Sequence, residues 1–254
     1  MPLPLLIDKL SIVIPVPKVV APEEIVKLLN EVKIEDGNVL VGCDASGLEL
    51  RMLAHYMKDE NYVRTVTEGS SKEGTDVHTV NQKAAGLETR DQAKTFIYAF
   101  LYGAGDSKIG SIVGGSARDG ERLKNRFLKG TPALQRLRDK VASYASKGFV
   151  PGLDGRKIWV RSEHAALNSL LQGAGAIVMK KALVILNKNL RKAGVEYKFV
   201  ANVHDEWQIE TKKEHANIVG ELAVEAIREA GRVYNLFCPL DGEYKIGRNW
   251  RETH

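Results

Sequence analysis

The sequence contains little cysteine and no long uninterrupted apolar segment. Cys43 and Cys238 are the two cysteines among 254 residues, which is too few for a disulfide framework or a cysteine-rich metal site. No window approaches the ~18 uninterrupted apolar residues of a membrane helix. Internal repeats and low-complexity stretches are also lacking. We therefore expect a protein of a reducing, cytosolic compartment with no membrane partner.

A secretory signal is not expected either. The first seventeen residues, MPLPLLIDKLSIVIPVP, are apolar but are interrupted by prolines and by Asp8 and Lys9. They lack the basic start and the long apolar run of a signal peptide. Hydrophobic residues make up 44% of the chain and charged residues 27%, a balance typical of globular proteins. The net charge of +5 mildly favours an anionic partner, although many basic proteins bind no nucleic acid.

Strands are expected near both ends of the chain, with helices between them. The apolar run at 38–44 predicts a buried strand, and the later strands are expected at 196–203, 206–211 and near 240–246. The patterns predict further elements: helices at 22–32, 47–57, 76–86, 89–105, 116–129, 132–147, 163–192 and 213–231, a loop at 58–75, and a hairpin at 148–162. This order predicts an α+β protein, a sheet domain with a helical insertion.

The stretch ANVHDEWQIE (201–210) places an imidazole and two carboxylates between strand-like segments. Taken alone, it favours a polar hairpin tip. Asp44, however, also stands at the end of an expected strand. If the two strands are neighbours, Asp44 and Asp205 face one point, and such carboxylates repel unless a cation lies between them. Oxygen ligands of this kind suit Mg²⁺, and a pair of ions supports in-line phosphoryl displacement.

The expected helix at 89–105 carries residues that suit a triphosphate. Arg90, Lys94 and Tyr98 follow one another at four-residue spacing and so form one stripe. An arginine fork and a lysine charge bind phosphates, and the tyrosine ring offers a stacking surface. The spacing equally allows a solvated basic edge above an aromatic core residue.

Three ordered segments resemble motifs A, B and C of family A DNA polymerases: DASGLELR (44–51), RDQAKTFIYAFLYG (90–103) and VHDE (203–206). The residues of these segments are most similar to those of the replicative polymerases of podovirus-type bacteriophages. Four further stretches support the resemblance, which covers about residues 38–254: DVHTVNQ (76–82), GLDGRK (152–157), VRSEHAALNSLLQGAGA (160–176) and GRNWRETH (247–254).

The resemblance implies a role for each matching residue. Asp44 and Asp205, with the carbonyl of Ala45, would hold two Mg²⁺ ions, and Glu206 would lie beside the primer terminus. Lys94 would complete this catalytic set. The resemblance further implies a pocket for the incoming deoxynucleotide formed by Glu49, which would exclude a 2′-hydroxyl, and by His78, Arg90, Lys94, Tyr98 and Tyr102.

Contacts to primer–template DNA are implied for Asn168, Gln172, His204 and Arg156. Amide donors in the minor groove meet acceptors that all correct base pairs share, so they check shape without reading sequence. Simpler interpretations stay open: Asn168 and Gln172 as solvated helix residues, His204 as a turn residue packed under the sheet, and His78 as a helix-start residue without a ligand.

The resemblance implies palm at 38–58 and 148–254, fingers at 59–147, and an extension of unclear role at 1–37. Neither a thumb nor an exonuclease domain is expected in this chain. A separate polypeptide carrying them would then be a partner, and the compartment would be the cytoplasm of a bacterial host. The leading hypothesis is a template-directed DNA polymerase module, the carboxyl-terminal part of a split or truncated enzyme. The alternatives are a DNA- or nucleotide-binding module without turnover alone, and a two-metal nuclease or phosphatase, which leaves Glu49 and the Arg90 stripe unexplained.

Overall fold

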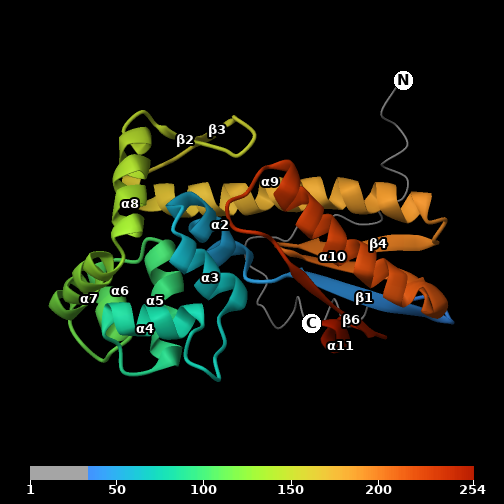
Figure 1. Cartoon of the computed structure of the whole chain (residues 1–254), viewed down its shortest axis with the longest axis horizontal. Coiled ribbons are helices and arrows are strands. Elements are labelled where there is room, and N and C mark those ends of the chain that lie inside the picture. Colours follow the sequence, from blue (N-terminus) through green and yellow to red (C-terminus); the bar gives the residue numbers. More distant parts are fainter. Residues whose placement is uncertain (1–33) are drawn as a thin grey trace. The chain divides into compact units, whose positions relative to one another are not determined.

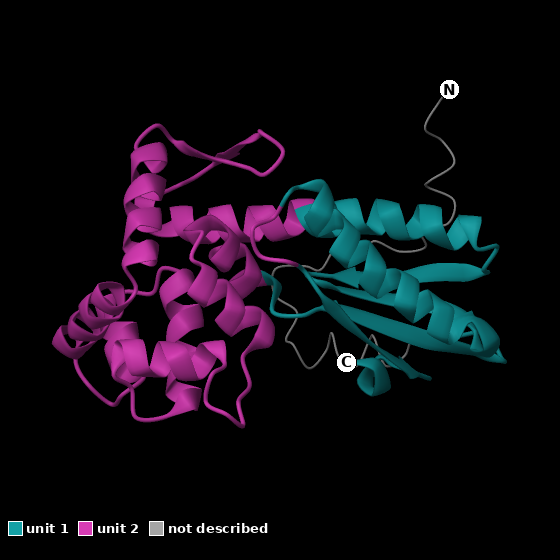
Figure 2. Cartoon of the chain, viewed as in Figure 1, with its two compact units in different colours: residues 1–48, 178–235, 240–254 teal, residues 49–177, 236–239 magenta. Residues whose placement is uncertain are grey.

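The computed structural model describes residues 34–254, so the helix expected at 22–32 and most of the amino-terminal extension lie outside the described residues. The described part divides into two compact units (Figure 2). Unit 1 comprises residues up to 48 together with 178–235 and 240–254, and unit 2 comprises 49–177 and 236–239. The expected palm and fingers boundaries stay a prediction.

A four-stranded antiparallel sheet forms the centre of unit 1, in the order β4-β5-β1-β6 (Figure 1). Its strands and the helices of this unit are β1 (Asn38–Ala45), β4 (Tyr197–Val203), β5 (Glu206–Lys212), β6 (Gly242–Gly247), the 3₁₀ helix η1 (Lys213–His215), α10 (Ala216–Val233), α11 (Trp250–Thr253) and the second half of α9 (Glu163–Lys192). The α+β class with an antiparallel sheet is confirmed.

The two faces of this sheet differ in chemistry. Val41 and Cys43 of β1 lie opposite Ile209 and Trp207 of β5, and all four are fully buried. Helix α10 packs against β1 and β6 on that side, where its Gly220 leaves room for the ring of Tyr244. Because side chains alternate along a strand, Gly42 and Asp44 point to the other face. This second face is polar.

Unit 2 is mainly helical, as the sequence predicts for this part of the chain. Its elements are α2 (Leu48–Met57, whose first residue belongs to unit 1), α3 (Glu60–Glu68), α4 (Val77–Ala85), α5 (Arg90–Leu101), α6 (Asp106–Ser111), α7 (Ala117–Gly130), α8 (Pro132–Ala145), the hairpin β2 (Phe149–Pro151) and β3 (Lys157–Trp159), and the first half of α9. Phe96, Phe100 and Phe127 form an aromatic cluster, with ring centroids 5.1 to 5.9 Å apart.

Three short helices differ from the expectation. Residues 60–68 form α3 where a loop was expected, and Asp59 caps this helix by accepting a hydrogen bond from the Tyr62 amide. Tyr62 is the buried residue of this helix. A single buried side chain gives too weak an apolar periodicity to identify a helix from the sequence. Helices α6 and α11 are six and four residues long, again too short for a periodic signal.

Helix α9 meets the length and composition of a membrane-spanning helix, the one described element that does so. In its most apolar window, 56% is buried inside the protein, as in the core helix of a soluble protein.

Candidate nucleotidyl-transfer site

The two predicted carboxylates meet in unit 1 through the backbone. The Ala45 amide at the end of β1 donates a hydrogen bond of 3.0 Å to the carbonyl of Asp205. Strand β5, which follows Asp205, pairs with β1 throughout, and Asp44 lies directly opposite Glu206. The condition for a shared site, that the two strands are neighbours, is therefore met.

Crowding of negative charge perturbs Asp44. Partial burial, followed by repulsion from Asp205 and Glu206, raises the pKa of Asp44 to about 6, with His254 opposing the rise. A divalent cation removes that repulsion and favours the ionised form. Among the described residues, no group of three or more His, Cys, Asp or Glu side chains is arranged to hold a metal. Two carboxylates with a main-chain oxygen still fit Mg²⁺, which keeps waters and substrate phosphates in its shell.

His204 and Asp205 form the two-residue turn between β4 and β5. His204 has a φ of 53°, in the left-handed region that non-glycine residues rarely adopt. The residue is exposed, so the interpretation that it packs under the sheet is wrong. Its strained backbone fixes the direction in which the chain enters Asp205.

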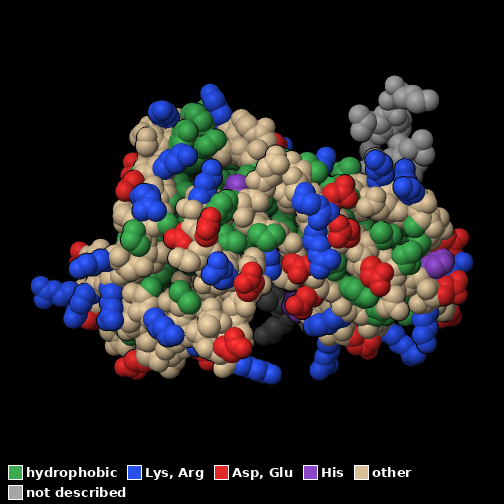
Figure 3. All heavy atoms as spheres, in the orientation of Figure 1, with side chains coloured by type: hydrophobic (Ala, Val, Ile, Leu, Met, Phe, Trp, Pro, Cys, Tyr) green, Lys and Arg blue, Asp and Glu red, His purple; other side chains and the backbone are tan. Residues whose placement is uncertain are grey.

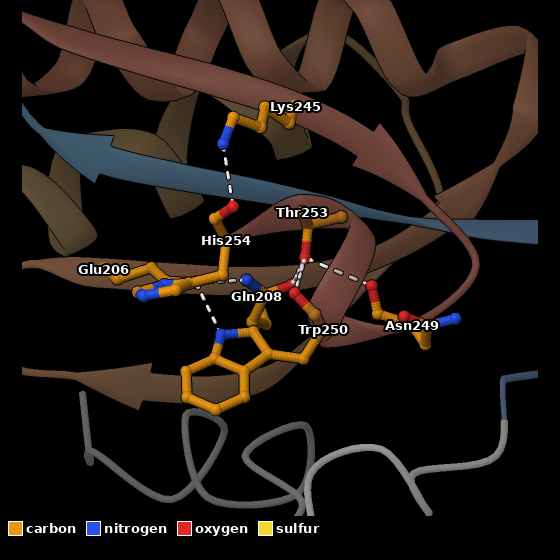
Figure 4. A network of polar contacts seen from close by, with 7 residues as sticks. All are labelled: Glu206, Gln208, Lys245, Asn249, Trp250, Thr253 and His254. Carbon is orange, nitrogen blue, oxygen red and sulfur yellow. Dashed lines mark hydrogen bonds and ion pairs between the residues drawn. The ribbon is translucent and has the colours of Figure 1, made fainter. Parts of the chain in front are cut away.

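Glu206 is held by the carboxyl-terminal segment of the chain (Figure 4). Its side chain is buried, and its Oε1 accepts a hydrogen bond of 2.7 Å from Trp250 Nε1 and a further one from Gln208. Its Oε2 lies 2.8 Å from Nδ1 of His254. Both carboxylate oxygens are therefore occupied by protein groups in this structure.

The same segment is fastened to the sheet at two further points. The Thr253 hydroxyl donates to Oε1 of Gln208 at 2.8 Å, and the Lys245 ammonium donates to the His254 carbonyl at 2.7 Å. A Cβ at Gly42 would come within 2.7 Å of Gln208 and Thr253, so only glycine fits beneath this contact. GRNWRETH (247–254) supports the family resemblance, but the sequence predicts no role for its residues. Gln208 is polar but buried, because α11 covers this face of the sheet.

In unit 2, the residues expected to hold a triphosphate gather around α5. Thr89 caps this helix in a capping box with Gln92, as the sequence predicts for Thr89. The Arg90 guanidinium donates to Oδ1 of Asp76 through Nε at 3.1 Å and Nη2 at 2.9 Å. Lys94, one turn further on, is exposed. Arg90 is thus partly neutralised by Asp76, whereas Lys94 presents its charge to solvent.

His78 belongs to the same group. Burial, and then the charge of Arg90, lower the pKa of His78, and Lys94 acts in the same direction. The imidazole lies 6.3 Å from the ring of Tyr98, centroid to centroid. Its Nδ1 is buried without a hydrogen-bond partner among the described residues. A buried ring nitrogen without a partner in the described residues is compatible with a residue that binds a polar ligand, and the role of His78 stays a prediction.

Two further predicted residues contact each other. The Tyr102 hydroxyl donates to Oε2 of Glu49 at 3.3 Å, joining the end of α5 to α2. Tyr102 is 51% exposed. Gly103, with a φ of 73°, continues the chain where a Cβ would lie 2.5 Å from the His164 carbonyl. The Tyr102 ring is therefore accessible, and the backbone beside it has room only for glycine.

The predicted DNA contacts of unit 2 lie on two elements. Asn168 and Gln172 are one turn apart on α9, and Gln172 is exposed. Oδ1 of Asn168 is buried and has no hydrogen-bond partner within the described part of the chain. Arg156, in the turn of the β2–β3 hairpin, pairs with Asp154 at 2.6 Å. Asn168 is therefore the member of this group with an unmet polar atom.

Comparisons with known proteins agree with the motifs. The model of DNA polymerase family A matches residues 16–252. This match begins before residue 38, where the resemblance carried by the motifs starts. The DNA-directed DNA polymerase of Enterobacteria phage T3 is 43% identical over 85% of this chain and 33% of its own length. That of Escherichia phage Phieco32 is 41% identical over 85% of this chain and 40% of its own length. This chain thus spans a third or somewhat more of these relatives.

A solved structure supports the fold. The POL domain of Pol1 from M. smegmatis, in complex with DNA primer-template and dNTP, matches with a TM-score of 0.77. The match covers 89% of this chain and 42% of that chain, at 21% sequence identity. At this identity the likeness shows the fold alone.

Proposed function

Since the chain belongs to DNA polymerase family A, we propose that it carries out template-directed nucleotidyl transfer from a deoxynucleoside triphosphate to a primer. In this reaction the primer 3′-hydroxyl loses its proton to water, and its oxygen forms a bond to the α-phosphorus. The bond from that phosphorus to the bridging oxygen breaks, and pyrophosphate leaves. The surrounding compartment would be the cytoplasm of a bacterial host.

The observation that carries the proposal is the joining of Asp44 and Asp205 by the Ala45 amide. Two Mg²⁺ ions held by these carboxylates would stabilise the negative charge on the attacking and leaving oxygens. The protein contributes a fixed pair of ligands on a rigid sheet, which requires no reorganisation during the reaction. Glu206 orients this turn through α11, so its proposed role is support beside the ligands.

The residues around α5 are proposed to hold the triphosphate. Lys94 offers an exposed ammonium for the departing pyrophosphate, and Arg90 offers the part of its guanidinium that Asp76 does not use. His78 Nδ1 would take a phosphate or sugar hydroxyl as its missing partner. Tyr98 would stack on the nucleotide, while Glu49, tied to Tyr102, would leave no room for a 2′-hydroxyl.

Asp205→Asn tests the proposal. The substitution keeps the size and the backbone bond but removes the ligand charge, so primer extension should fall by about a hundredfold or more. Glu221→Gln, on the exposed side of α10, serves as the matched control and should extend primers like the unaltered chain. Extension by Asp205→Asn at the rate of Glu221→Gln would reject the metal-ligand assignment.

A second candidate is a DNA- or nucleotide-binding module that needs a separate thumb-bearing chain for turnover. The chain spans 33% of the length of the phage T3 protein. Primer extension by the purified chain, with and without an added amino-terminal portion of such a relative, separates the two candidates. Extension that appears solely with the added portion supports the second.

A further inference from the structure

The β2–β3 hairpin of unit 2 has one face bound to the protein and one face open. Val150 of β2 is fully buried, and Ile158 lies opposite it on β3. A Cβ at Gly173 of α9 would come within 2.5 Å of Ile158 Cδ1, so the hairpin rests closely on this helix. Because side chains alternate along strands, the residues on either side of Ile158 point away from the protein.

An exposed tryptophan dominates the open face. Trp159 is 71% exposed, although tryptophan is usually buried over most of its surface. Its cross-strand partner is Phe149, and the two rings meet edge to face with centroids 6.0 Å apart. With this exposure, most of the indole surface stays accessible to a ligand. Val150 and Ile158, rather than Trp159, attach the hairpin to the rest of unit 2.

Positive charge surrounds this ring. The Lys157 ammonium lies 4.8 Å from the centre of the Phe149 ring, on the same hairpin face as Trp159. Lys147 lies over Tyr144 at the end of α8, and Arg161 follows the hairpin. None of these three cations takes part in an ion pair within residues 34–254. Figure 3 shows hydrophobic and basic side chains gathered over this hairpin.

We propose that the open face of the hairpin, formed by Phe149, Lys157 and Trp159, binds single-stranded DNA by stacking. A nucleotide supplies both a flat base for the indole and a phosphate for the lysines, and such sites combine aromatic platforms with basic grooves. An acidic protein segment would satisfy the cations but leave the indole face without a partner. The proposal rests on the proposed function, because a template-directed enzyme must hold an unpaired strand.

The test measures binding of a labelled oligothymidylate of about 20 nucleotides by fluorescence anisotropy. EDTA is present and no dNTP is added, so no catalytic activity is needed. Trp159→Ala should weaken binding by about tenfold, because one base loses its stacking partner. Trp159→Phe, which keeps a ring, should recover most of the affinity. Val184→Ala, at an apolar position that is 60% exposed, is the matched control and should bind normally.

Salt dependence distinguishes the two components of the site. Lys157→Gln should reduce the slope of log affinity against log salt by about 0.7, the value for one phosphate contact on a single strand. Trp159→Ala should leave that slope unchanged, because stacking releases no counterion. Circular dichroism of each variant confirms that the fold is retained.

Two results would overturn the proposal. One is a loss with Trp159→Ala no greater than with Val184→Ala. The other is Trp159-dependent binding of an oligoglutamate with unchanged binding of the oligonucleotide, which would assign the face to an acidic protein partner. Asp205→Asn protein should bind the oligonucleotide normally while failing in extension. The failure of either proposal is therefore visible without the other.

Discussion

Asp76 organises two helices with one carboxylate. It caps α4 by accepting from the His78 amide at 3.1 Å, accepts from the Thr79 hydroxyl at 2.6 Å, and accepts from Arg90 of α5. Burial opposes ionisation, but these hydrogen bonds outweigh it and lower the pKa of Asp76 to about 2. The residue thus sets both the start of α4 and the position of an arginine proposed to bind phosphate.

This lowered pKa predicts acid sensitivity. A carboxyl whose folded pKa lies below its unfolded value stabilises the protein above about pH 4, and the contribution is lost as the pH falls toward 2. The side chain is 10% exposed, so the contribution is on the order of 2 kcal/mol. Urea unfolding between pH 5 and about 2 should therefore show a steeper loss of stability for the unaltered chain than for Asp76→Asn.

Asp154→Asn is the control for this measurement. Asp154 also pairs with an arginine, Arg156, but on an exposed turn where ion pairs contribute little. Its pH dependence should match that of the unaltered chain. Equal slopes for all three proteins would show that Asp76 does not couple to folding.

Single residues were predictable where their chemistry is local. The cap at Thr89, the stripe Arg90–Lys94–Tyr98 and the acid at the end of β1 follow from spacing and strand boundaries. The partners of these residues were not predictable. Asp76 lies fourteen positions before Arg90 and the Trp250 indole lies 44 after Glu206, and no local pattern encodes such contacts.

Among the elements, β5 shows how a strand pattern can mislead. Its sequence EWQIETK alternates polar and apolar residues, which is typical of a strand with one solvated face. In the structure Glu206, Gln208 and Glu210 are buried as well. Helix α11 covers the first two, and the amide of Asn38 with the backbone of Glu35 binds the third. Long helices such as α9 were predicted at their full extent, whereas the short element that decides the burial of β5 was not.

The covering role of α11 predicts the effect of Trp250→Phe. The substitution keeps an aromatic ring but removes the indole N–H that bonds to buried Glu206. Leaving that carboxylate oxygen with one donor fewer should lower the free energy of unfolding by about 1–3 kcal/mol. Thermal unfolding measures the change, with Trp159→Phe on the exposed hairpin as a control expected to stay within about 0.5 kcal/mol. Equal stability of the two variants would show that the indole bond contributes nothing.

At the scale of the whole molecule, the chain builds two units that each have a core of their own. Unit 1 packs Trp207 and Ile209 beneath α10, and unit 2 packs the cluster of Phe96, Phe100 and Phe127. Unit 1 is assembled from segments at both ends of the chain, so its sheet depends on β6 and α11 closing against β1. The proposed metal ligands belong to unit 1, and the proposed triphosphate residues belong to unit 2.

If the two cores are energetically separate, a cavity in one should loosen that unit alone. Phe127→Ala removes the centre of the aromatic cluster and should cost about 3–5 kcal/mol, while Ile209→Ala should cost about 2–5 kcal/mol. Hydrogen exchange followed by mass spectrometry reports where protection is lost. Phe127→Ala should speed exchange in α4, α5 and α7 and spare β1, β5 and β6, and Ile209→Ala should do the reverse. Equal acceleration in both units by either variant would mean that the chain unfolds as one cooperative body, so that a change beside the proposed triphosphate residues would also disturb the carboxylates of the sheet.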